Sequence, residues 1–328
     1  MYHQIGFPPG GDPCIGIFVF QLCLTSSPGF YPPKNCNMKR LIFIPVFLFP
    51  VFLIFNGCTN SSTRQGQEDM VDSSAIVKGW KLGVQMWTFH YFPFTTALEK
   101  TDSAGIKYIE AFPGQPLGAD LHDTFDIRMT AASKARVKQL LQGKGIRIVA
   151  MGVIDPSTIA EWIKYFDLAK EFGLSYITAE PRKDQWDQVD SLAGLYGIKI
   201  AIHDHPKPNA YWSPDSVLAA TKGHPNIGSC ADVGHWARNG LDPVECLKKL
   251  EGHVFGVHLK DIKEFNNTEA ADTVVGKGIN NFPAIFAELK RQGFKGMFSI
   301  EQESNWYNNV PDVINTRKYF EELTAKLQ

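Results

Sequence analysis

Acidic and imidazole side chains follow several apolar runs of this chain, a pattern that can bind a metal ion. In the clearest case the run 227–231 leads directly to Asp232, and His235 follows three residues later. Carboxylate oxygens and imidazole nitrogens are common ligands of divalent cations. An Asp at the end of a strand is also a frequent helix cap or turn former, so this stretch alone leaves both roles open.

Four other predicted strands also end on such a residue: Glu180, His203, His258 and Glu301. Side chains alternate between the two faces of a strand, so the residues two positions earlier would share the same face. Those residues are all small: Thr178, Ala201, Cys230, Gly256 and Ser299. The residues between them are apolar and would face covering helices: Ile177, Ile202, Ala231, Val257 and Ile300. The shared parity predicts that the five strand ends form one site.

The elements that would position these residues alternate regularly from Trp80 onward. Eight short runs rich in β-forming residues are each followed by a helical pattern: Leu82–Trp87, Ile106–Ala111, Ile146–Met151, Ser175–Glu180, Ile198–His203, Ile227–Asp232, Val254–Leu259 and Gly296–Glu301. Apolar residues from Ile159 to Phe172 recur at helical spacing and predict one buried face. Eight such units in about 250 residues predict a single (β/α)8 TIM barrel of class α/β. No glycine-rich dinucleotide fingerprint follows the first run, which disfavours a doubly wound open sheet.

Proline and glycine positions set the expected helix ends. Pro156, Pro214, Pro243 and Pro283 are predicted to lie in first turns of helices. Glycines at 105, 145, 173, 197 and 293 are predicted to follow helices and to precede the next strand.

The first 78 residues have a different composition from the rest. Residues 38–40 are Met-Lys-Arg, residues 41–55 carry no charge, and Asn56-Gly57-Cys58 follows. This order resembles a bacterial lipoprotein signal, with Cys58 as the lipidated first mature residue. We therefore expect an N-terminal extension before the true start (1–37), a signal peptide (38–58), a flexible linker (59–78) and the barrel (79–328). An exported lipoprotein, attached to a membrane only through Cys58 and facing the periplasm or the cell surface, follows from this division.

Composition excludes some classes of function. The net charge is −1 and no basic stripe is evident, so a nucleic-acid partner is not expected. Four of the six cysteines precede residue 60, so the barrel has no disulfide framework.

Five short motifs together resemble one known family. They are Ala179-Glu180-Pro181, Ile202-His203-Asp204-His205-Pro206, Asp232-Val233-Gly234-His235, Val257-His258-Leu259-Lys260-Asp261 and Ser299-Ile300-Glu301. Over residues 80–325 the chain is similar to the xylose isomerase-like TIM-barrel superfamily, also called sugar phosphate isomerase/epimerase or AP endonuclease family 2. The resemblance implies one divalent metal ion held by Glu180, Asp232, His258 and Glu301. This oxygen-rich set favours Mn²⁺, Mg²⁺ or Co²⁺, with Zn²⁺ as an alternative.

The resemblance also implies chemistry on a small carbohydrate. We expect an isomerase or epimerase of a keto-sugar that works through an enediolate, with Glu180 and Glu301 transferring protons. A hydratase or dehydratase of a 3-keto or unsaturated sugar is the alternative, because it shares the same intermediate. A non-catalytic sugar-binding lipoprotein and an AP endonuclease are less favoured. No arginine cluster lies near the strand ends, which favours an unphosphorylated substrate.

Further side chains near the strand ends are candidates for catalysis or substrate binding. His203 and Lys260 are candidate catalytic groups. The alternative for His203 is a packing role, and the alternative for Lys260 is a position at the surface. The candidate substrate contacts are Gln85, Glu110, His205, His235 and Trp306. The sequence leaves the exact substrate, the physiological metal and the oligomeric state open.

Overall fold

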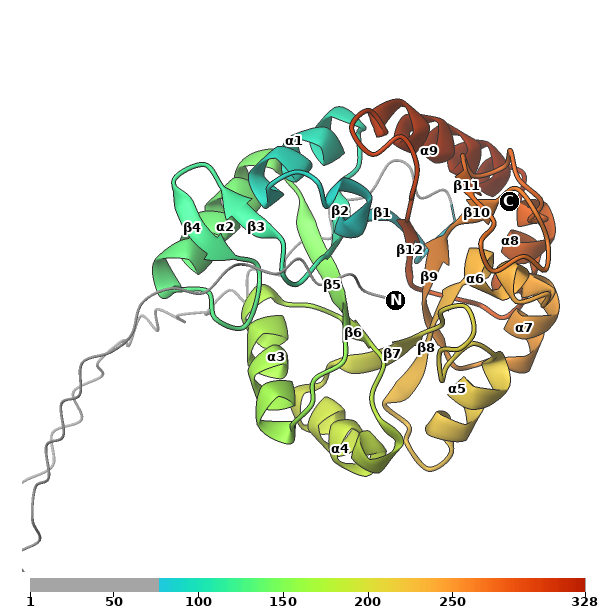
Figure 1. Ribbon diagram of the computed structural model, residues 1–328, viewed down its shortest axis with the longest axis horizontal. Helices are drawn as coiled ribbons and strands as arrows, with labels where there is room; N and C mark the ends of the chain where they lie inside the picture. Colours follow the sequence, from blue (N-terminus) through green and yellow to red (C-terminus); the bar gives the residue numbers. More distant parts are fainter. Residues whose placement is uncertain (1–76, 328) are drawn as a thin grey trace, which may run out of the picture. The chain divides into compact units, whose positions relative to one another are not determined.

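The computed structural model describes residues 77–327, and parallel strands close into a barrel at its centre (Figure 1). The strand order around the barrel is β1-β12-β9-β8-β7-β6-β5-β2. The predicted (β/α)8 barrel is therefore confirmed. The predicted extension, signal peptide with Cys58, and linker lie outside the described residues, except for residues 77 and 78, and remain predictions.

All eight predicted runs are barrel strands. Their bounds are β1 (Lys81–Gln85), β2 (Tyr108–Ala111), β5 (Arg147–Ile154), β6 (Tyr176–Ala179), β7 (Lys199–His203), β8 (Ile227–Asp232), β9 (Val254–Leu259) and β12 (Met297–Ile300). Two short antiparallel pairs were not predicted: β3 (Pro116–Gly118) with β4 (Leu121–Thr124), and β10 (Asp261–Ile262) with β11 (Asp272–Thr273). These pairs lie in strand-to-helix connections and are too short to show a period.

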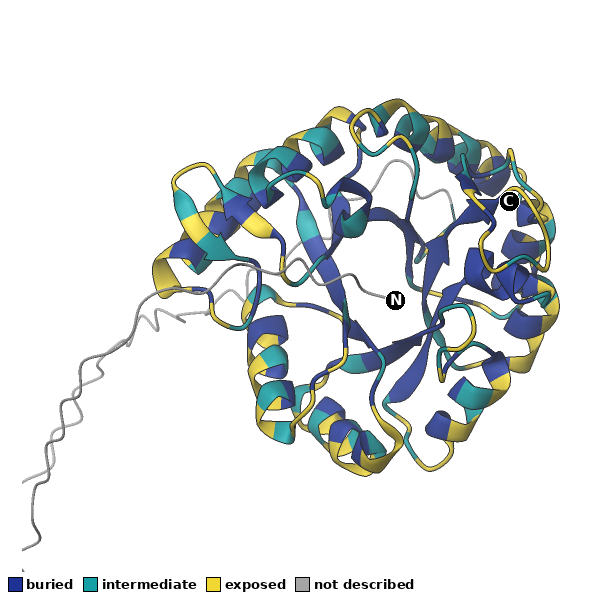
Figure 2. Cartoon of the chain, in the orientation of Figure 1, coloured by how far each residue is buried: buried dark blue, intermediate teal, exposed yellow. Residues whose placement is uncertain are grey.

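Helices surround the barrel, and apart from the short helix of residues 233–238, which is buried throughout, their outer faces are exposed (Figure 2). Their bounds are α1 (Phe94–Ser103), α2 (Ala131–Lys144), α3 (Ile159–Phe172), α4 (Trp186–Tyr196), α5 (Pro214–Thr221), α6 (Val233–Arg238), α7 (Pro243–Lys249), α8 (Phe282–Arg291) and α9 (Val310–Ala325), with 3₁₀ turns η1 (Met86–Phe89) and η2 (Lys183–Gln185). Within residues 77–327 no helix has the length and apolar character that a membrane crossing would need.

The predicted helix ends are correct except at Pro156. Pro214 and Pro243 begin α5 and α7, and Pro283 is the second residue of α8. The prediction for Pro156 is wrong, because α3 begins three residues later at Ile159. Thr158 caps α3 and forms a reciprocal capping box with Glu161, which fixes the start of the helix there.

Alternate strand residues are buried in two separate places, as the parity predicted. Ile177, Ile202 and Val257 belong to the large core between the strands and the helices. A smaller apolar cluster fills the barrel interior, and we call it the floor cluster: Tyr108, Val149, Ala150, Tyr176, Ala201, Cys230 and Met297. Several of its members open their strands, so it lies toward the amino ends. A Cβ on Gly256 would lie 2.6 Å from the Tyr176 hydroxyl, which explains why the interior needs a glycine there.

Candidate metal and substrate site

Four buried side chains converge at the carboxyl ends of adjacent strands. The ligand atoms of His203, Asp232, His258 and Glu301 all lie within 4.8 Å of one another, and we call these residues the ligand cluster. His258 Nδ1 lies 2.9 Å from Glu301 Oε2 and 3.0 Å from His203 Nε2. Asp232 Oδ2 lies 3.6 Å from His203 Nε2. The strands β7, β8, β9 and β12 that supply them are consecutive neighbours in the barrel, so the convergence follows from the fold.

Glu180 lies beside this cluster, in a second group with His203 and His205. Its carboxylate pairs with the His205 imidazole and accepts a hydrogen bond from Asn209 Nδ2 at 2.7 Å. The predicted ligand set therefore differs from the observed cluster at one position, where His203 stands in place of Glu180. His203 belongs to both groups and so connects Glu180 to the ligand cluster. The role of Glu180 as a ligand remains a prediction.

The two carboxylate oxygens of Asp232 have different roles. Its Oδ1 accepts hydrogen bonds from the backbone N–H groups of Gly234 and His235, at 2.9 and 3.0 Å, and so caps α6. Its Oδ2 is buried and has no hydrogen bond, although Lys260 Nζ lies 3.3 Å away as an ion pair. A buried carboxylate oxygen without a hydrogen bond is costly unless a ligand satisfies it. The cap therefore holds one oxygen so that the other faces the ligand cluster.

The donor set fits a divalent metal ion. The ligand cluster offers two imidazole nitrogens and two carboxylates, and one of its carboxylate oxygens lacks a hydrogen bond. Two nitrogens among four ligands suit Zn²⁺, Co²⁺ or Mn²⁺ better than Mg²⁺, which prefers oxygen ligands and water. The observed set thus contains one nitrogen more than the predicted set.

Glu110 lies behind His258, fully buried. Its Oε2 lies 2.9 Å from His258 Nε2 and accepts a hydrogen bond from Ser299 Oγ at 2.7 Å. A carboxylate in this position orients the ring, so that Nδ1 faces Glu301 and His203 inside the ligand cluster. Glu110 has Oε2 engaged by His258 and Ser299 and Oε1 without a hydrogen bond, so its predicted role as a substrate contact remains a prediction. Its position orients His258.

Lys260 is almost completely buried beside the ligand cluster, so the alternative of a surface lysine is wrong. Its Nζ lies 3.2 Å from Glu301 Oε2 and 3.5 Å from Glu303 Oε1. Burial alone lowers the pKa of Lys260, but Asp232, Glu301 and Glu303 outweigh it and raise the pKa well above the usual value. Lys260 therefore supplies a fixed positive charge.

The pKa values of two neighbouring histidines shift in the opposite direction from that of Lys260. Burial lowers the pKa of His203 and of His235 well below the usual value, and nearby cationic and imidazole groups act in the same direction. His235 lies between two cations, with Nε2 at 3.1 Å from Lys260 Nζ and Nδ1 at 3.0 Å from Arg238 Nη1. Both imidazoles are therefore neutral near pH 7, the state that can bind a metal or accept a proton.

Arg238 and Asp272 extend this network, and the sequence did not identify them as a pair. The Arg238 guanidinium pairs with the Asp272 carboxylate and donates to the carbonyl of Ala270. Asp272 also accepts a hydrogen bond from the backbone N–H of Glu303 at 3.1 Å. Burial raises the pKa of Asp272 to about 6. Arg238 is thus engaged inside the protein.

The remaining predicted substrate contacts lie in different settings. Both ends of the Gln85 amide are used internally, since Nε2 donates to the Gly152 carbonyl at 3.1 Å and Oε1 accepts from Trp87 N at 3.2 Å. His205 is partly exposed, and its Nδ1 lies 3.4 Å from His203 Nδ1. Trp306 is half-buried in the loop after β12. His205 and Trp306 remain candidate substrate contacts, whereas the Gln85 amide is engaged in hydrogen bonds with backbone groups.

Only one of the functional residues missed at the level of the sequence carried a usable signal there. Glu303 lies two positions after Glu301 and shares its parity, so the alternation rule would have included it. Asn209 and Asp272 are in connections between barrel strands, where no period marks the direction of a side chain.

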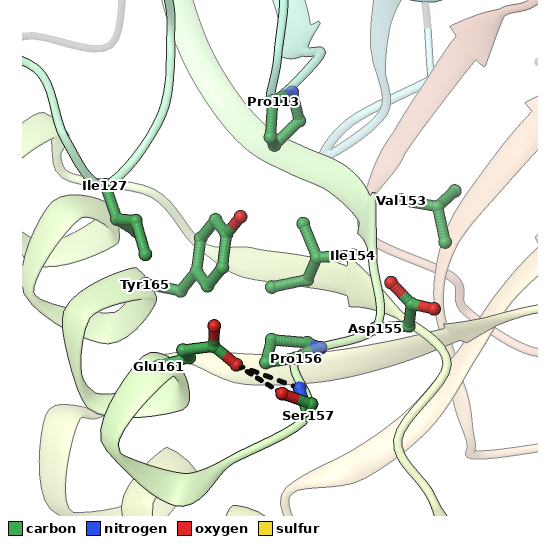
Figure 3. Close-up of a pocket in the computed structure, with 9 residues that line it drawn as sticks. All are labelled: Pro113, Ile127, Val153, Ile154, Asp155, Pro156, Ser157, Glu161 and Tyr165. Carbon is green, nitrogen blue, oxygen red and sulfur yellow. Dashed lines mark hydrogen bonds between the residues drawn. The ribbon is translucent and has the colours of Figure 1, made fainter. Parts of the chain in front are cut away.

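A pocket of about 370 Å³ lies between the end of β5 and the first turns of α3 (Figure 3). Its walls combine apolar side chains with Asp155, Ser157 and Glu161, and they include Ile154, whose carbonyl accepts the backbone N–H of Glu180 at 2.9 Å. In Figure 3 the Glu161 carboxylate binds Ser157 at one edge, by contacts of 2.9 and 3.0 Å. The pocket lining consists of Pro113, Ile127, Val153, Ile154, Asp155, Pro156, Ser157, Glu161 and Tyr165.

Comparison with known proteins places this site in context. A family profile described as "Xylose isomerase-like TIM barrel" matches residues 98–323. An inosose dehydratase from Bacillus cereus (strain AH820) is 24% identical over 209 residues, which cover 50% of this chain and 70% of that protein. The first three curated relatives are matched over 45%, 70% and 52% of their own length, so the chain spans about half of two of them.

Solved structures agree with the barrel architecture. An uncharacterized protein from Parabacteroides distasonis ATCC 8503 is 36% identical, with a TM-score of 0.61 and coverage of 74% of this chain and 98% of that chain. A D-tagatose 3-epimerase-like protein is 19% identical, with a TM-score of 0.60 and coverage of 75% and 98%. At this low identity the second likeness shows the fold alone.

Proposed function

Because this chain belongs to the xylose isomerase-like TIM barrel family, we propose that it is a divalent-metal-dependent epimerase or isomerase of a keto-sugar or related polyol. The observation that carries the proposal is the ligand cluster, whose Asp232 Oδ2 is buried without a hydrogen bond. The name of the inosose dehydratase among the curated relatives supports a small polyhydroxylated substrate.

The ligand cluster would hold the metal ion through His203 Nε2, Asp232 Oδ2, His258 Nδ1 and Glu301. A bound divalent cation would polarise the substrate carbonyl and so acidify the neighbouring C–H bond. Burial alone raises the pKa of Glu301, but Lys260 and His258 outweigh it and lower the pKa to about 2. Glu301 is therefore ionised at neutral pH, as a ligand must be.

Glu180 is the side chain best placed to remove the proton. Its side chain is 19% exposed, whereas Glu301 retains only 7% exposure, so a substrate at the mouth of the barrel reaches Glu180 more easily. His205, which pairs with the Glu180 carboxylate, is 40% exposed and can pass the proton to solvent. Lys260 Nζ, held against Glu301 as a fixed positive charge, would stabilise the enediolate oxygen, and the predicted role of Glu301 in returning the proton to carbon stays a prediction.

A dehydratase is the second candidate, and the inosose dehydratase among the curated relatives favours it. Glu180 would again take the proton from the carbon next to the carbonyl. The proton on Glu180 would then pass to the hydroxyl that leaves from the next carbon, while Lys260 Nζ stabilises the enolate oxygen as a fixed positive charge. A C–H and a C–O bond break, a C=C bond forms, and one water molecule is released. The same residues serve both reactions, so only the product separates them.

Isotope exchange tests the proposal. We expect the Mn²⁺-loaded protein, incubated in D₂O with a panel of free ketoses, inososes and 3-keto-glycosides, to place deuterium next to the carbonyl of at least one. NMR would detect the exchange and identify the product. EDTA should stop the exchange, and Glu180→Gln should remove it. Glu99→Gln, an exposed position on α1, serves as the control. Undiminished exchange in Glu180→Gln would overturn the role of Glu180, and exchange unaffected by EDTA would overturn the metal requirement.

We further propose that the protein is exported and anchored through a lipid on Cys58, on the basis of the sequence around that residue. Cells that express the full chain should incorporate radiolabelled palmitate into it. Cys58→Ser should abolish the labelling and release the protein from the membrane fraction. Equal labelling of the variant would contradict the proposal.

A further inference from the structure

An aromatic surface lies beside the mouth of the barrel, outside the ligand cluster, and includes the candidate substrate contact Trp306. It consists of Trp87, His90, Tyr91, Trp306 and Tyr307, which we call the aromatic shelf. The first three follow β1 and the other two follow β12, and these strands are paired in the barrel. Trp87 stacks on His90 with ring centroids 4.0 Å apart, and Tyr91 stacks on Tyr307 at 5.2 Å with an interplanar angle of 8°. Trp306 contacts both His90 and Tyr91 edge to face.

The outer rings of the shelf are exposed to solvent. Tyr91 is 52% exposed and Tyr307 is 75% exposed. A single exposed aromatic ring needs no explanation, but two parallel rings joined to three others form a continuous apolar surface. Such a surface beside an active site suits a ligand with an apolar face.

Hydrogen bonds fix the shelf in position. Thr88 Oγ1 donates to the Ile300 carbonyl at 3.2 Å and accepts from the backbone N–H of Gln302 at 3.1 Å. The Thr88 carbonyl accepts from Asn309 Nδ2 at 2.5 Å. The segment after β1 and the loop after β12 are thus joined through one buried threonine. A surface held in this way loses little conformational entropy when it binds a ligand.

The shelf is continuous with the ligand cluster through one side chain. Trp87 Nε1 donates to Glu303 Oε1 at 3.0 Å, and the same oxygen lies 3.5 Å from Lys260 Nζ. Lys260 in turn contacts Glu301. When one sugar unit is bound at the ligand cluster, the next unit of the same molecule can therefore reach the aromatic shelf.

We propose that the aromatic shelf binds a second sugar ring, so that the preferred substrate is a di- or oligosaccharide rather than a free monosaccharide. The inference rests on the proposed function and extends it. The C–H face of a pyranose packs against aromatic rings by dispersion. The Glu303 side chain, 26% exposed where the shelf meets the cluster, offers an acceptor to the sugar hydroxyls.

Calorimetric binding of unreactive probes tests this inference without requiring turnover. We expect maltose, cellobiose or sucrose to bind the full-length protein about tenfold more tightly than D-glucose. Tyr307→Ala should lower the affinity for whichever disaccharide binds most tightly by about fivefold to tenfold, the size of one aromatic contact. The affinity for D-glucose should not change. Tyr307→Phe should keep the affinity because it keeps the ring. Leu195→Ala, which removes a 79% exposed apolar side chain from α4, is the matched control.

Three outcomes would overturn the inference. The first is that no disaccharide binds more tightly than D-glucose. The second is that Tyr165→Ala, in the pocket of Figure 3, weakens disaccharide binding while Tyr307→Ala does not. The third is that only 4-nitrophenyl glucoside depends on Tyr307, which would assign the shelf to an aryl group. Shelf-dependent binding without any deuterium exchange would instead refute the proposed function alone.

Discussion

The two ends of the barrel interior are equally buried and chemically opposite. Toward the amino ends, the floor cluster packs Tyr108, Tyr176 and Met297 against small neighbours. At the carboxyl ends, the ligand cluster and Lys260 bring ionisable groups together at 0–7% exposure. Burying an apolar group stabilises a fold, whereas burying a charge costs free energy unless partners compensate. The same strands thus have one end whose apolar packing stabilises the fold and another, the costly end, whose buried charges lower its stability.

Unsatisfied carboxylate oxygens mark the costly end. Among residues 77–327, the buried carboxylate oxygens without a hydrogen bond are Asp232 Oδ2, Glu110 Oε1 and Asp204 Oδ2, all at or beside the ligand cluster, whereas the floor cluster has one such hydroxyl, that of Tyr176. Burial and the neighbouring Asp232 also raise the pKa of Asp204 well above the usual value. Perturbed titratable groups of this kind concentrate where a protein binds or reacts. Activity should therefore depend on one end of the barrel and stability on the other.

The largest effect should come from Asp232→Asn. The amide keeps an oxygen to cap α6 but loses the charge that a metal ion needs. We expect metal content to fall to background and turnover to fall on the order of 10³-fold, while the thermal midpoint changes little. Elemental analysis, kinetics and calorimetry on one preparation would measure all three. A variant with full metal content would show that Asp232 is only a cap.

Met297→Ala should give the reverse pattern at the floor. Met297 is fully buried, and its truncation leaves a cavity that should lower the free energy of unfolding by about 2–4 kcal/mol. Metal content should not change, because the cavity opens at the other end. Urea unfolding with and without metal would measure the effect, with Leu195→Ala as the exposed control. Loss of metal together with stability would contradict the separation of the two ends.

Glu110→Gln sharpens the comparison, because Glu110 lies below the ligand cluster. The amide loses the charge that orients His258, and we expect metal affinity to fall about 10- to 100-fold. The free energy of unfolding should change less than in Met297→Ala. Competition with a chelator of known affinity would measure the loss. Unchanged affinity would mean that packing alone orients His258.

The smallest effect should come from a charge outside the barrel. Hydrogen bonds from Arg291 and Gln292 lower the pKa of Glu288 to about 2. A carboxyl whose pKa is lowered by folding stabilises above its unfolded pKa, here 4.5, and loses this contribution as the pH falls toward about 2. We expect Glu288→Gln to cost at most about 1 kcal/mol at neutral pH, because Arg291 is largely exposed. Urea midpoints should converge with the wild type as the pH falls below 4.5, with metal content unchanged; a constant gap would contradict this assignment.

Several of the sequence-based predictions depended only on local rules, and the structure confirms them. Strand alternation predicted that Ile177 and Ile202 face the helices and that Ala201 and Cys230 face the interior. Proline and glycine positions predicted most helix ends. The exception was Pro156, where the Thr158–Glu161 capping box was not considered. The predicted N-terminal signal and its lipid attachment remain predictions.

The sequence alone determined the barrel, its strands and the five strand ends that form the site, because the parity of a strand depends only on residue spacing. The tertiary structure decided how those ends are grouped. It put His203 with the ligand cluster, Glu180 beside His205, and Glu110 behind His258, since these contacts depend on strand stagger and rotamers. It also decided that Lys260 is buried among carboxylates, because burial depends on which loops cover the barrel mouth.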